Sequence, residues 1–231
     1  MNSIIECIKK EFRGWKLPEI AGLLVVFAII LFNFIVLKDS KIATISAFCG
    51  IMYTVIAGKG KISCYLFGLS GSGFYSYLAY ANALYGNLAL YLFYYIPMQI
   101  IGVFKWKSNL KKDTQEIYKT SLSIKERVLL VLVSVILSFV ICSVLYVLND
   151  THPIYDGIGT ALSLVGMYLT VRRCIEQWIV WFVVNLFSML MWVCVILAGG
   201  KTYSTVLMWF VYLLLSVYFY KEWEKEVTPH K

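Results

Sequence analysis

Residues 177–197, QWIVWFVVNLFSMLMWVCVIL, form a run without a single charged side chain. A helix that crosses a membrane needs roughly 20 predominantly apolar residues, and this run has that length. Trp178, Trp181 and Asn185 recur in it at positions i, i+3 and i+7, which lie on one face of a helix. The stretch predicts a membrane-spanning helix that carries an amide and two indoles on the same face.

The composition of the whole chain is that of an integral membrane protein. Of its 231 residues, 60% are hydrophobic and 15% are charged, whereas soluble domains have roughly 45–50% apolar and about 25% charged residues. The six cysteines show no metal-ligand spacing, and no phosphate-binding or catalytic motif occurs in the sequence. We therefore expect an all-α membrane protein that has no metal, no cofactor and no enzymatic activity.

Seven further apolar runs have the length of a membrane helix, which gives eight expected transmembrane helices. The expected spans are residues 20–37, 41–57, 63–80, 86–104, 128–148, 155–171, 177–197 and 203–220. With these spans, 18 of the 21 basic residues lie on the side of the N-terminus, and only Lys38, Lys41 and Lys201 lie on the other. This split predicts that both termini are cytoplasmic. The net charge of +8 then reflects topology and anionic lipid rather than nucleic acid.

The second to fourth spans resemble the sixth to eighth. The two sets of three spans align at an offset of about 115 to 118 residues. The first set contains SAFCGIMY, GKGKIS and IIGVFKWKS, and the second contains the corresponding stretches SLVGMYLT, VRRCIEQ and VYFYKEWEK. Parallel repeats are a feature of transporters, which hold the substrate near the middle of the membrane. The expected organisation is a cytoplasmic segment (1–19), a peripheral helix (20–37), a first three-helix repeat (41–104), a loop with a linker helix (105–148), a second repeat (155–220) and a tail (221–231).

Neutral polar side chains mark the expected binding site, because no charged residue lies deep in a span. The absence of charged residues inside the spans argues against proton coupling, against a charged-ring channel and against strongly anionic substrates. It does not exclude sodium coordinated by carbonyls. An unpartnered amide in hydrocarbon costs roughly 1–3 kcal/mol, so Asn185 should face protein, water or ligand. The alternative is an interfacial tryptophan belt with an asparagine bonded to a neighbouring helix. Residues 86–104 offer a matching wall with Asn87, Tyr91 and Gln99, although such tyrosines also serve in packing.

Four further features carry expectations. Pro97 should bend its helix, and the glycines and serines of GLSGSG, residues 68–73, should allow close helix approach. Ser70 or Ser72 could alternatively line a pathway. We expect Glu176, beside Arg172 and Arg173, to belong to a solvated cluster, and the polar stretch 105–125 to be a solvated connector.

Three stretches of the sequence are distinctive: RR with EQWIVWFVVN, YGNLALYLFYYIPMQIIGVFKW and FRGWKLPEIAGLLV. Together they resemble the PnuC family of vitamin transporters, and the resemblance covers about residues 12 to 223. The resemblance implies facilitated diffusion of nicotinamide riboside across a bacterial inner membrane, drawn inward by phosphorylation of the nucleoside. It also implies a core of three helices, a linker helix and three helices, similar to the SWEET sugar transporters, and a homo-oligomer such as a trimer. Carried over by motif, the substrate-binding residues would be Trp178, Trp181, Asn185, Gln99, Asn87 and Tyr91.

The residues themselves suit such a ligand. Nicotinamide riboside has a flat cationic ring, which aromatic faces attract, and a carboxamide and hydroxyls, which Asn and Gln can bind. The motif leaves related substrates open: thiamine, also a flat cation, is the nearest rival, followed by riboflavin and deoxynucleosides. Two other classes are a membrane-embedded enzyme acting on lipid, which lacks catalytic groups here, and a non-transporting scaffold subunit that docks a partner through residues 105–125.

Overall fold

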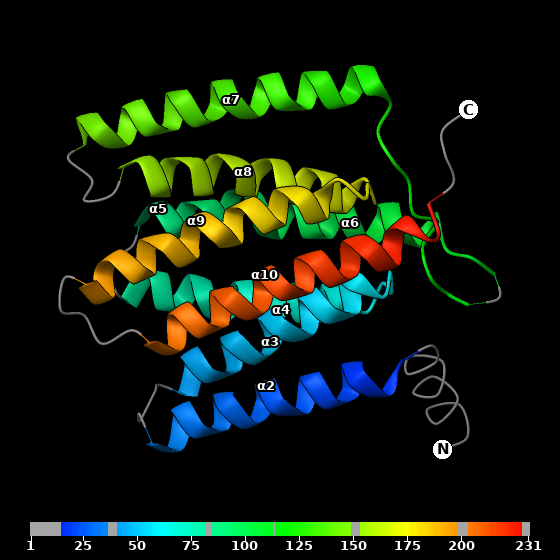
Figure 1. Ribbon diagram of the computed structural model, residues 1–231, viewed down its shortest axis with the longest axis horizontal. Coiled ribbons are helices and arrows are strands. Elements are labelled where there is room, and N and C mark those ends of the chain that lie inside the picture. The colour runs from blue at the N-terminus through cyan, green and yellow to red at the C-terminus, as the bar shows by residue number, and fades with distance from the viewer. Residues whose placement is uncertain are drawn as a thin grey trace. The chain divides into compact units, whose positions relative to one another are not determined.

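The computed structural model describes residues 15–36, 41–81, 85–112, 114–148, 153–197 and 203–227. The chain divides into two compact units, residues 1–118 and 119–231, which are described separately. The first unit contains α2 (Leu17–Val36), α3 (Lys41–Gly58), α4 (Cys64–Ala81), and a last helical stretch made of α5 (Tyr85–Leu90), the π-helix η1 (Tyr91–Tyr95) and α6 (Ile96–Lys107). The second contains α7 (Ile124–Val147), α8 (Pro153–Val171), α9 (Gln177–Leu197) and α10 (Tyr203–Glu224), as labelled in Figure 1.

The helical stretches fall on the predicted spans. Within the described residues there are eight of them when α5, η1 and α6 count as one. Four are long and apolar enough to cross a membrane by length and composition alone: Glu19–Val36, Leu88–Lys107, Ile124–Val147 and Pro153–Val171. Two shorter apolar helices, Thr44–Gly58 and Gln177–Leu190, lie at further predicted spans. The fold is therefore all-helical with several membrane-length apolar helices, as the sequence predicts.

Helix α7 begins four residues before the predicted span because its first turn is capped. Ser123 has an extended backbone, with φ −66° and ψ 161°, and its hydroxyl accepts the N–H of Glu126. The carboxylate of Glu126 in turn accepts the N–H of Ser123 at 2.9 Å. This reciprocal capping box satisfies two donors that a helix start otherwise leaves unpaired. The remainder of α7 is apolar, and none of its residues is buried, which suits a helix surrounded by lipid.

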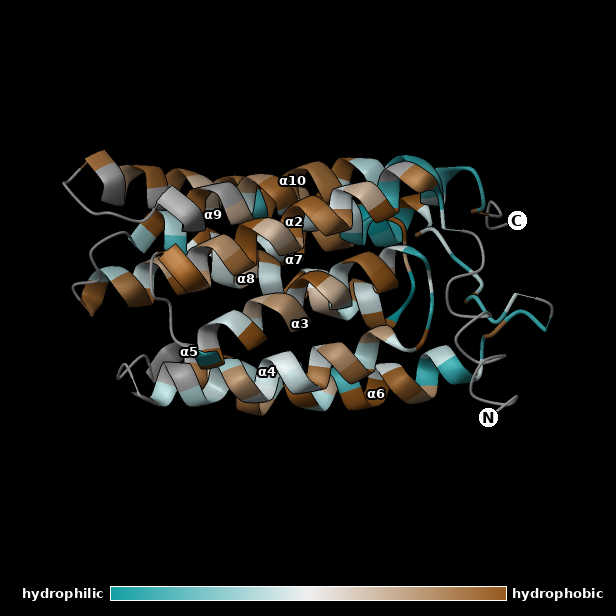
Figure 2. Cartoon of the chain, turned by 90° about the horizontal axis from the view of Figure 1, so that it is seen from below, coloured by the Kyte–Doolittle hydropathy of each residue, from teal (hydrophilic) through white to brown (hydrophobic). Residues whose placement is uncertain are grey.

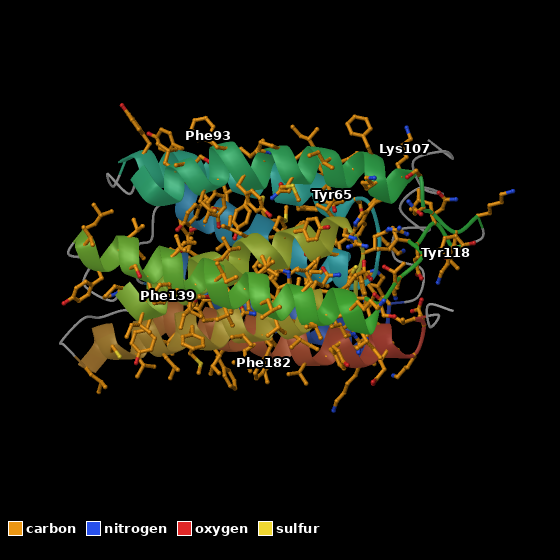
Figure 3. All side chains as sticks on the ribbon, turned by 90° about the horizontal axis from the view of Figure 1, so that it is seen from above. Tyr65, Phe93, Lys107, Tyr118, Phe139 and Phe182 are labelled. Atoms are coloured by element: carbon orange, nitrogen blue, oxygen red, sulfur yellow. The ribbon has the colours of Figure 1, made fainter. Side chains whose placement is uncertain are left out.

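Hydropathy follows the helices in both units. Figure 2 shows predominantly hydrophobic residues along the helices, with hydrophilic residues concentrated at helix ends and connections. Large apolar side chains are exposed, such as Phe139 on α7 and Phe93 on η1, which points away from the helices in Figure 3. Exposed apolar surface on this scale would be unfavourable in water, and it indicates a lipid environment.

The last helical stretch of the first unit is interrupted where Pro97 requires it. Proline has no N–H, and its ring clashes with the carbonyl four residues earlier. The π-helix Tyr91–Tyr95 lies directly before α6. Pro97 lies in the first turn of α6. A π-helical turn is rare and often lies at a functional site. The sequence predicted a bend at Pro97, and the structure replaces one α-helical turn by a wider one.

Helix α2 contacts the rest of the first unit at two points. Within its apolar window Glu19–Val36 no residue is buried. Phe27 stacks on Phe48 of α3 with ring centroids 4.8 Å apart, and Glu19 pairs with Lys59 at 2.5 Å. These contacts attach α2 at one apolar and one charged point.

The turn between α3 and α4 has the same backbone geometry as the turn between α8 and α9. Gly60 in the first and Arg173 in the second both have a positive φ, 70° and 62°. The carbonyl of Gly60 accepts the N–H of Ile117 at 2.9 Å, and the carbonyl of Arg173 accepts the N–H of Thr120 at 3.0 Å. These two turns are related by an offset of 113 residues, slightly less than the sequence suggested. The two turns therefore share a local geometry, and the internal repeat itself stays a prediction.

Candidate functional site

Asn185 of α9 is buried against α10. Its side-chain N–H donates to the hydroxyl of Ser216 at 3.1 Å, and that hydroxyl donates to the carbonyl of Tyr212 at 2.9 Å. Asn185 is 6% exposed and Ser216 2%. The amide is thus bonded to a neighbouring helix, as the plainer interpretation expected. Within the described residues this is the one hydrogen bond of the side chain, and it uses the nitrogen. The oxygen Oδ1 is not one of the fully buried atoms that lack a partner.

Trp181 points toward α8. Its indole N–H donates to the Thr170 hydroxyl at 3.1 Å, and that hydroxyl donates to the carbonyl of Gly166 at 2.9 Å. The indole lies directly over Gly166: a Cβ added at that glycine would be 3.1 to 3.3 Å from three ring atoms. Trp181 is only partly buried, so part of its side chain stays accessible while its N–H is bonded.

Trp178 lies deeper in the second unit than Trp181. It is 3% exposed and packs against Phe219 and Trp223 of α10, with centroid distances of 5.2 and 5.6 Å. Its indole N–H is buried without a hydrogen-bond partner. The three predicted residues of α9 therefore all face protein rather than lipid, with Trp178 and Asn185 turned to α10 and Trp181 to α8. Their roles in binding stay predictions.

Gln99 of α6 is the counterpart of Asn185 in the first unit. It is 4% exposed, and its amide N–H donates to the hydroxyl of Ser72 on α4 at 2.9 Å. Its carbonyl oxygen Oε1 is buried and has no partner. Ser72 thus lies on the inner face, whereas Ser70 is exposed, which separates the two serines that the sequence left as alternatives.

Tyr91 of η1 stacks on Tyr75 of α4, with ring centroids 4.3 Å apart, and meets Tyr95 edge to face at 4.8 Å. It is therefore a packed ring whose site role remains a prediction. Asn87 lies in α5, but its side chain falls outside the described residues, as does that of Asn33 in α2.

The two units pair the same chemical groups with the partners exchanged. In the first unit, Ser72 on α4 binds the amide of Gln99 on α6. In the second unit, the amide is Asn185 on α9 and the serine is Ser216 on α10. Sequence analysis did not predict Ser216. The repeat could have revealed it, because it follows Gln99 at the offset of 117 residues that also relates Trp106 to Trp223.

Each unit also contains a glycine covered by an aromatic ring of the neighbouring helix, and the helices that supply the glycine and the ring are exchanged between the units. In the first unit Tyr53 of α3 covers Gly68 of α4, where an added Cβ would be 2.7 Å from the ring. In the second unit Trp181 of α9 covers Gly166 of α8. Gly71 also meets Cys49, at 3.0 Å from an added Cβ. The prediction that glycines of GLSGSG allow close helix approach is confirmed for Gly68 and Gly71.

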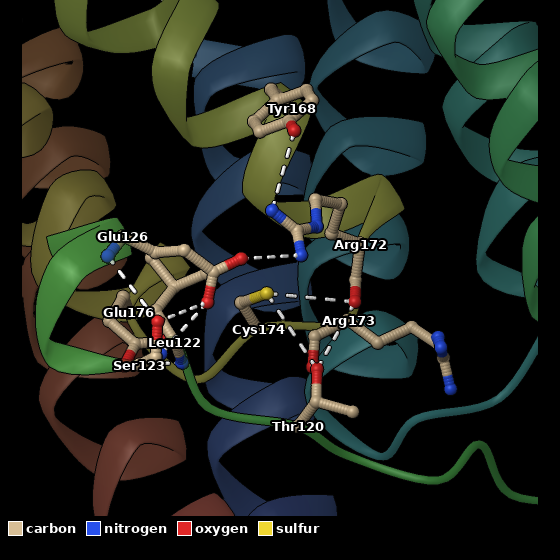
Figure 4. Close-up of polar contacts among 9 residues, drawn as sticks. All are labelled: Thr120, Leu122, Ser123, Glu126, Tyr168, Arg172, Arg173, Cys174 and Glu176. Atoms are coloured by element: carbon tan, nitrogen blue, oxygen red, sulfur yellow. Dashed lines mark hydrogen bonds and ion pairs between the residues drawn. The ribbon is translucent and has the colours of Figure 1, made fainter. Parts of the chain in front are cut away.

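The prediction of a solvated cluster around Glu176 is wrong. Glu176 is 6% exposed, and its Oε1 atom accepts the N–H of Leu122 at 3.0 Å and pairs with Arg127 at 2.9 Å. Arg172 binds Glu126 instead, at 3.0 Å. Figure 4 shows Leu122, Glu126, Arg172 and Glu176 around the α8–α9 turn. The sequence placed Glu176 beside two arginines, but its cation comes from α7, and the reason is the packing of the capped first turn of α7 against this turn.

The stretch 105–125 is likewise more than a solvated connector. In the first unit Ile117 is fully buried and pairs with the α3–α4 turn. In the second unit Thr120 pairs with the α8–α9 turn, and Leu122 is 5% exposed. Lys119 is also buried, paired with Glu226 at 2.7 Å and placed over the ring of Trp223 at 5.4 Å. Each half of the stretch is therefore fixed to its own unit.

Cys174 lies under Thr120 in this turn and is 2% exposed. Its thiol is 3.7 Å from the Thr120 hydroxyl and 3.6 Å from the carbonyl of Arg172. Burial raises the pKa of the Cys174 thiol. The residue is therefore a structural cysteine without nucleophilic character. Among the described residues, no group of three or more His, Cys, Asp or Glu could hold a metal ion.

Comparisons with known proteins give consistent matches. The model of the family described as nicotinamide mononucleotide transporter matches residues 40–225. The nicotinamide riboside transporter PnuC of Neisseria mucosa is 35% identical over 228 residues, covering 96% of this chain and 87% of the relative. The protein of the same name from Haemophilus influenzae is 30% identical over 223 residues, covering 95% and 96%. A crystal structure of the vitamin B3 transporter PnuC is similar with a TM-score of 0.81 at 34% identity, covering 94% of this chain and 95% of that one.

Proposed function

This chain belongs to the PnuC family of membrane transporters, and on that premise we propose that it carries nicotinamide riboside across a bacterial inner membrane by facilitated diffusion. Membership in a family of transporters agrees with the prediction that the chain is not an enzyme. The observation that carries the proposal is that each unit contains one buried amide. Asn185 and Gln99 are each bonded through nitrogen to a serine. Within the described residues the carbonyl oxygen of Gln99 is fully buried without a partner, and the one side-chain bond of Asn185 leaves its carbonyl oxygen unused.

These groups suit the chemistry of the riboside. A buried acceptor without a donor is unfavourable by about 1–3 kcal/mol, so a ligand that supplies the donor gains that much on binding. The carboxamide N–H and the ribose hydroxyls are such donors. The partly buried face of Trp181 offers a surface for the cationic ring, with an attraction of about 2 kcal/mol when water is excluded.

The family model and the relatives differ in the ligand that they name, a mononucleotide in one case and a riboside in the other. The arrangement of charge favours the riboside. The positively charged side chains of the described helices lie in or near their first or last turns, such as Lys41 in α3 and Lys105 in α6. A phosphate in the middle of the membrane would meet no fixed cation there and would lose its hydration without compensation.

The proposed topology has eight spans with both termini in the cytoplasm, and a homo-oligomer as the assembled form. The charge split of 18 basic residues against three supports this orientation. The first three-helix repeat, the linker helix α7 and the second repeat would form the transporting core, and α2 would remain peripheral. Inward flux would be maintained by phosphorylation of the riboside in the cytoplasm.

Calorimetric titration of the purified protein tests the substrate. We expect saturable binding of nicotinamide riboside and none of nicotinamide mononucleotide, thiamine, riboflavin or deoxynucleosides. Asn185→Leu should abolish binding and leave a folded protein. The matched control is Asn109→Leu, because within the described residues the side chain of Asn109 bonds only to Lys105 and Ser108 nearby in the chain. Binding of one of the other compounds without nicotinamide riboside would refute the assignment.

Flux measurements in liposomes test the mechanism. The proposal expects internal riboside to rise to the external concentration and no further. Accumulation above that level under an imposed proton or sodium gradient would show coupled transport instead. Absence of flux by the purified protein, with binding intact, would favour the scaffold alternative.

A further inference from the structure

The hydroxyl of Ser216 determines which end of the Asn185 amide is free. It has one proton, which it donates to the carbonyl of Tyr212, its own helix neighbour, at 2.9 Å. A hydroxyl that has given its proton to a carbonyl can only accept from a second partner. Asn185 lies 3.1 Å away and must therefore offer its N–H. This leaves the carbonyl oxygen Oδ1 directed away from Ser216.

The first unit contains a similar pair. Gln99 offers its N–H to the hydroxyl of Ser72 at 2.9 Å and keeps a buried Oε1 without a partner, although within the described residues the Ser72 hydroxyl donates to no carbonyl of its own helix. Two amides on different helices, each bonded to a serine on a neighbouring helix, thus use the nitrogen for that bond and not the carbonyl oxygen. The recurrence in both units, with amide and serine exchanged, favours a requirement for an acceptor over an accident of packing.

We propose that Ser216 is a positioning residue that fixes Asn185 with its carbonyl toward the substrate, so that the site selects ligands by a hydrogen-bond donor. This inference rests on the proposed transport of nicotinamide riboside. In that ligand the donor is the carboxamide N–H or a ribose hydroxyl. A site built for a donor rejects an analogue that lacks it, because a buried acceptor is then left unpaired. Ser216 acts only through Asn185 and touches no substrate itself.

The test compares affinities for three ligands rather than one. Nicotinic acid riboside replaces the carboxamide donor by a carboxylate, and deoxyribose analogues of nicotinamide riboside remove the hydroxyl donors. Wild type should reject the analogue that lacks the donor used. Ser216→Ala should weaken nicotinamide riboside by about 5- to 10-fold, the net effect of one hydrogen bond. It should also reduce the discrimination against that analogue by a similar factor, because the released amide can rotate and offer its N–H.

Two further variants control for structural damage. Ser216→Thr keeps the hydroxyl and should restore both affinity and discrimination. Ser143→Ala in α7 removes the same kind of bond, from a serine to the carbonyl four residues earlier at 2.8 Å, without an attached amide. It should leave binding of all ligands unchanged. Melting temperatures of the variants establish that each is folded.

The outcomes separate the two proposals. If Ser216→Ala weakens all ligands by the same factor, or weakens none, the positioning role is refuted while transport of the riboside stands. If the wild type does not bind nicotinamide riboside, the proposed function fails and this inference fails with it. A selective change for nicotinic acid riboside identifies the carboxamide as the donor, and a selective change for a deoxyribose analogue identifies the hydroxyl.

Discussion

Replacing Gly166 by alanine should move the Trp181 indole and weaken substrate binding. The added methyl group would be 3.1, 3.2 and 3.3 Å from three ring atoms, whereas non-bonded carbons prefer about 3.5–4.0 Å. The ring must therefore shift by roughly 0.3–0.5 Å. Its N–H lies 3.1 Å from the Thr170 hydroxyl, so such a shift takes the bond beyond the usual range of about 2.7–3.2 Å.

The magnitude follows from these two effects. Overpacking costs typically 1–3 kcal/mol, and the moderate overlap here places Gly166→Ala at about 1 kcal/mol. Loss of the indole bond adds about 1 kcal/mol. If the ring must return to its position to bind the riboside, the Kd should rise by roughly 5- to 30-fold, at 1.4 kcal/mol for each factor of ten.

The assay is calorimetric titration with nicotinamide riboside together with the melting temperature. Gly159→Ala on the same helix α8 is the matched control, because an added Cβ there has no atom within 4 Å. The control should bind like wild type and should be at least as stable, since alanine favours helix. Equal affinity of the two variants would refute the argument that the position of Trp181 matters for binding.

Three further predictions concern other parts of the molecule. Gly68→Ala on α4 should lower the melting temperature by several degrees, because its Cβ would be 2.7 Å from Tyr53, whereas Gly73→Ala, with no atom within 4 Å, should not. Arg127→Met should cost about 1–2 kcal/mol of stability, because it leaves Glu176 buried without its cation. The cost is limited because the guanidinium of Arg127 is half-exposed and partly screened by water. Adding Glu176→Gln should recover part of this loss in thermal unfolding, and no recovery would contradict the pairing. Cys174 should resist maleimide labelling at pH 8 in the folded protein and react in dodecyl sulfate, because burial raises its pKa; rapid labelling of the native protein would contradict the packing of this turn.

Hydrophobic runs and charge predicted the helices well because apolar length decides where a chain can cross lipid. The differences lie at helix ends, where side chains rather than hydropathy decide. Helix α7 begins at Ile124 because Ser123 and Glu126 form a capping box. Helix α10 continues to Glu224, and Trp223 near its end is fully buried. Neither effect changes the apolar content of a window, so neither appears in a hydropathy reading.

Spacing along one helix predicted that Trp178, Trp181 and Asn185 face inward, because helical geometry fixes which residues share a face. It could not predict which neighbour each residue meets. Ser216 and Thr170 are unremarkable hydroxyls in sequence, and only the packing of α10 and α8 against α9 brings them to the amide and the indole. Long-range partners of this kind require the tertiary fold.

For Glu176 the sequence suggested the wrong partners. A glutamate near two arginines is usually solvated, and the sequence favoured that interpretation. In the structure its cation is Arg127, 49 residues earlier in the chain, and a backbone N–H of the stretch before α7 completes the site. Charge proximity in sequence says little about a pair that forms between a turn and a distant helix start.

A density map of the protein with nicotinamide riboside bound tests the central claim most directly. The account predicts that a ligand donor lies within hydrogen-bond distance of Asn185 Oδ1 and that the pyridinium ring contacts the face of Trp181, with Ser216 still bonded to the amide nitrogen. Ligand density that leaves both side chains untouched, or an Asn185 amide that turns its nitrogen toward the ligand, would contradict it.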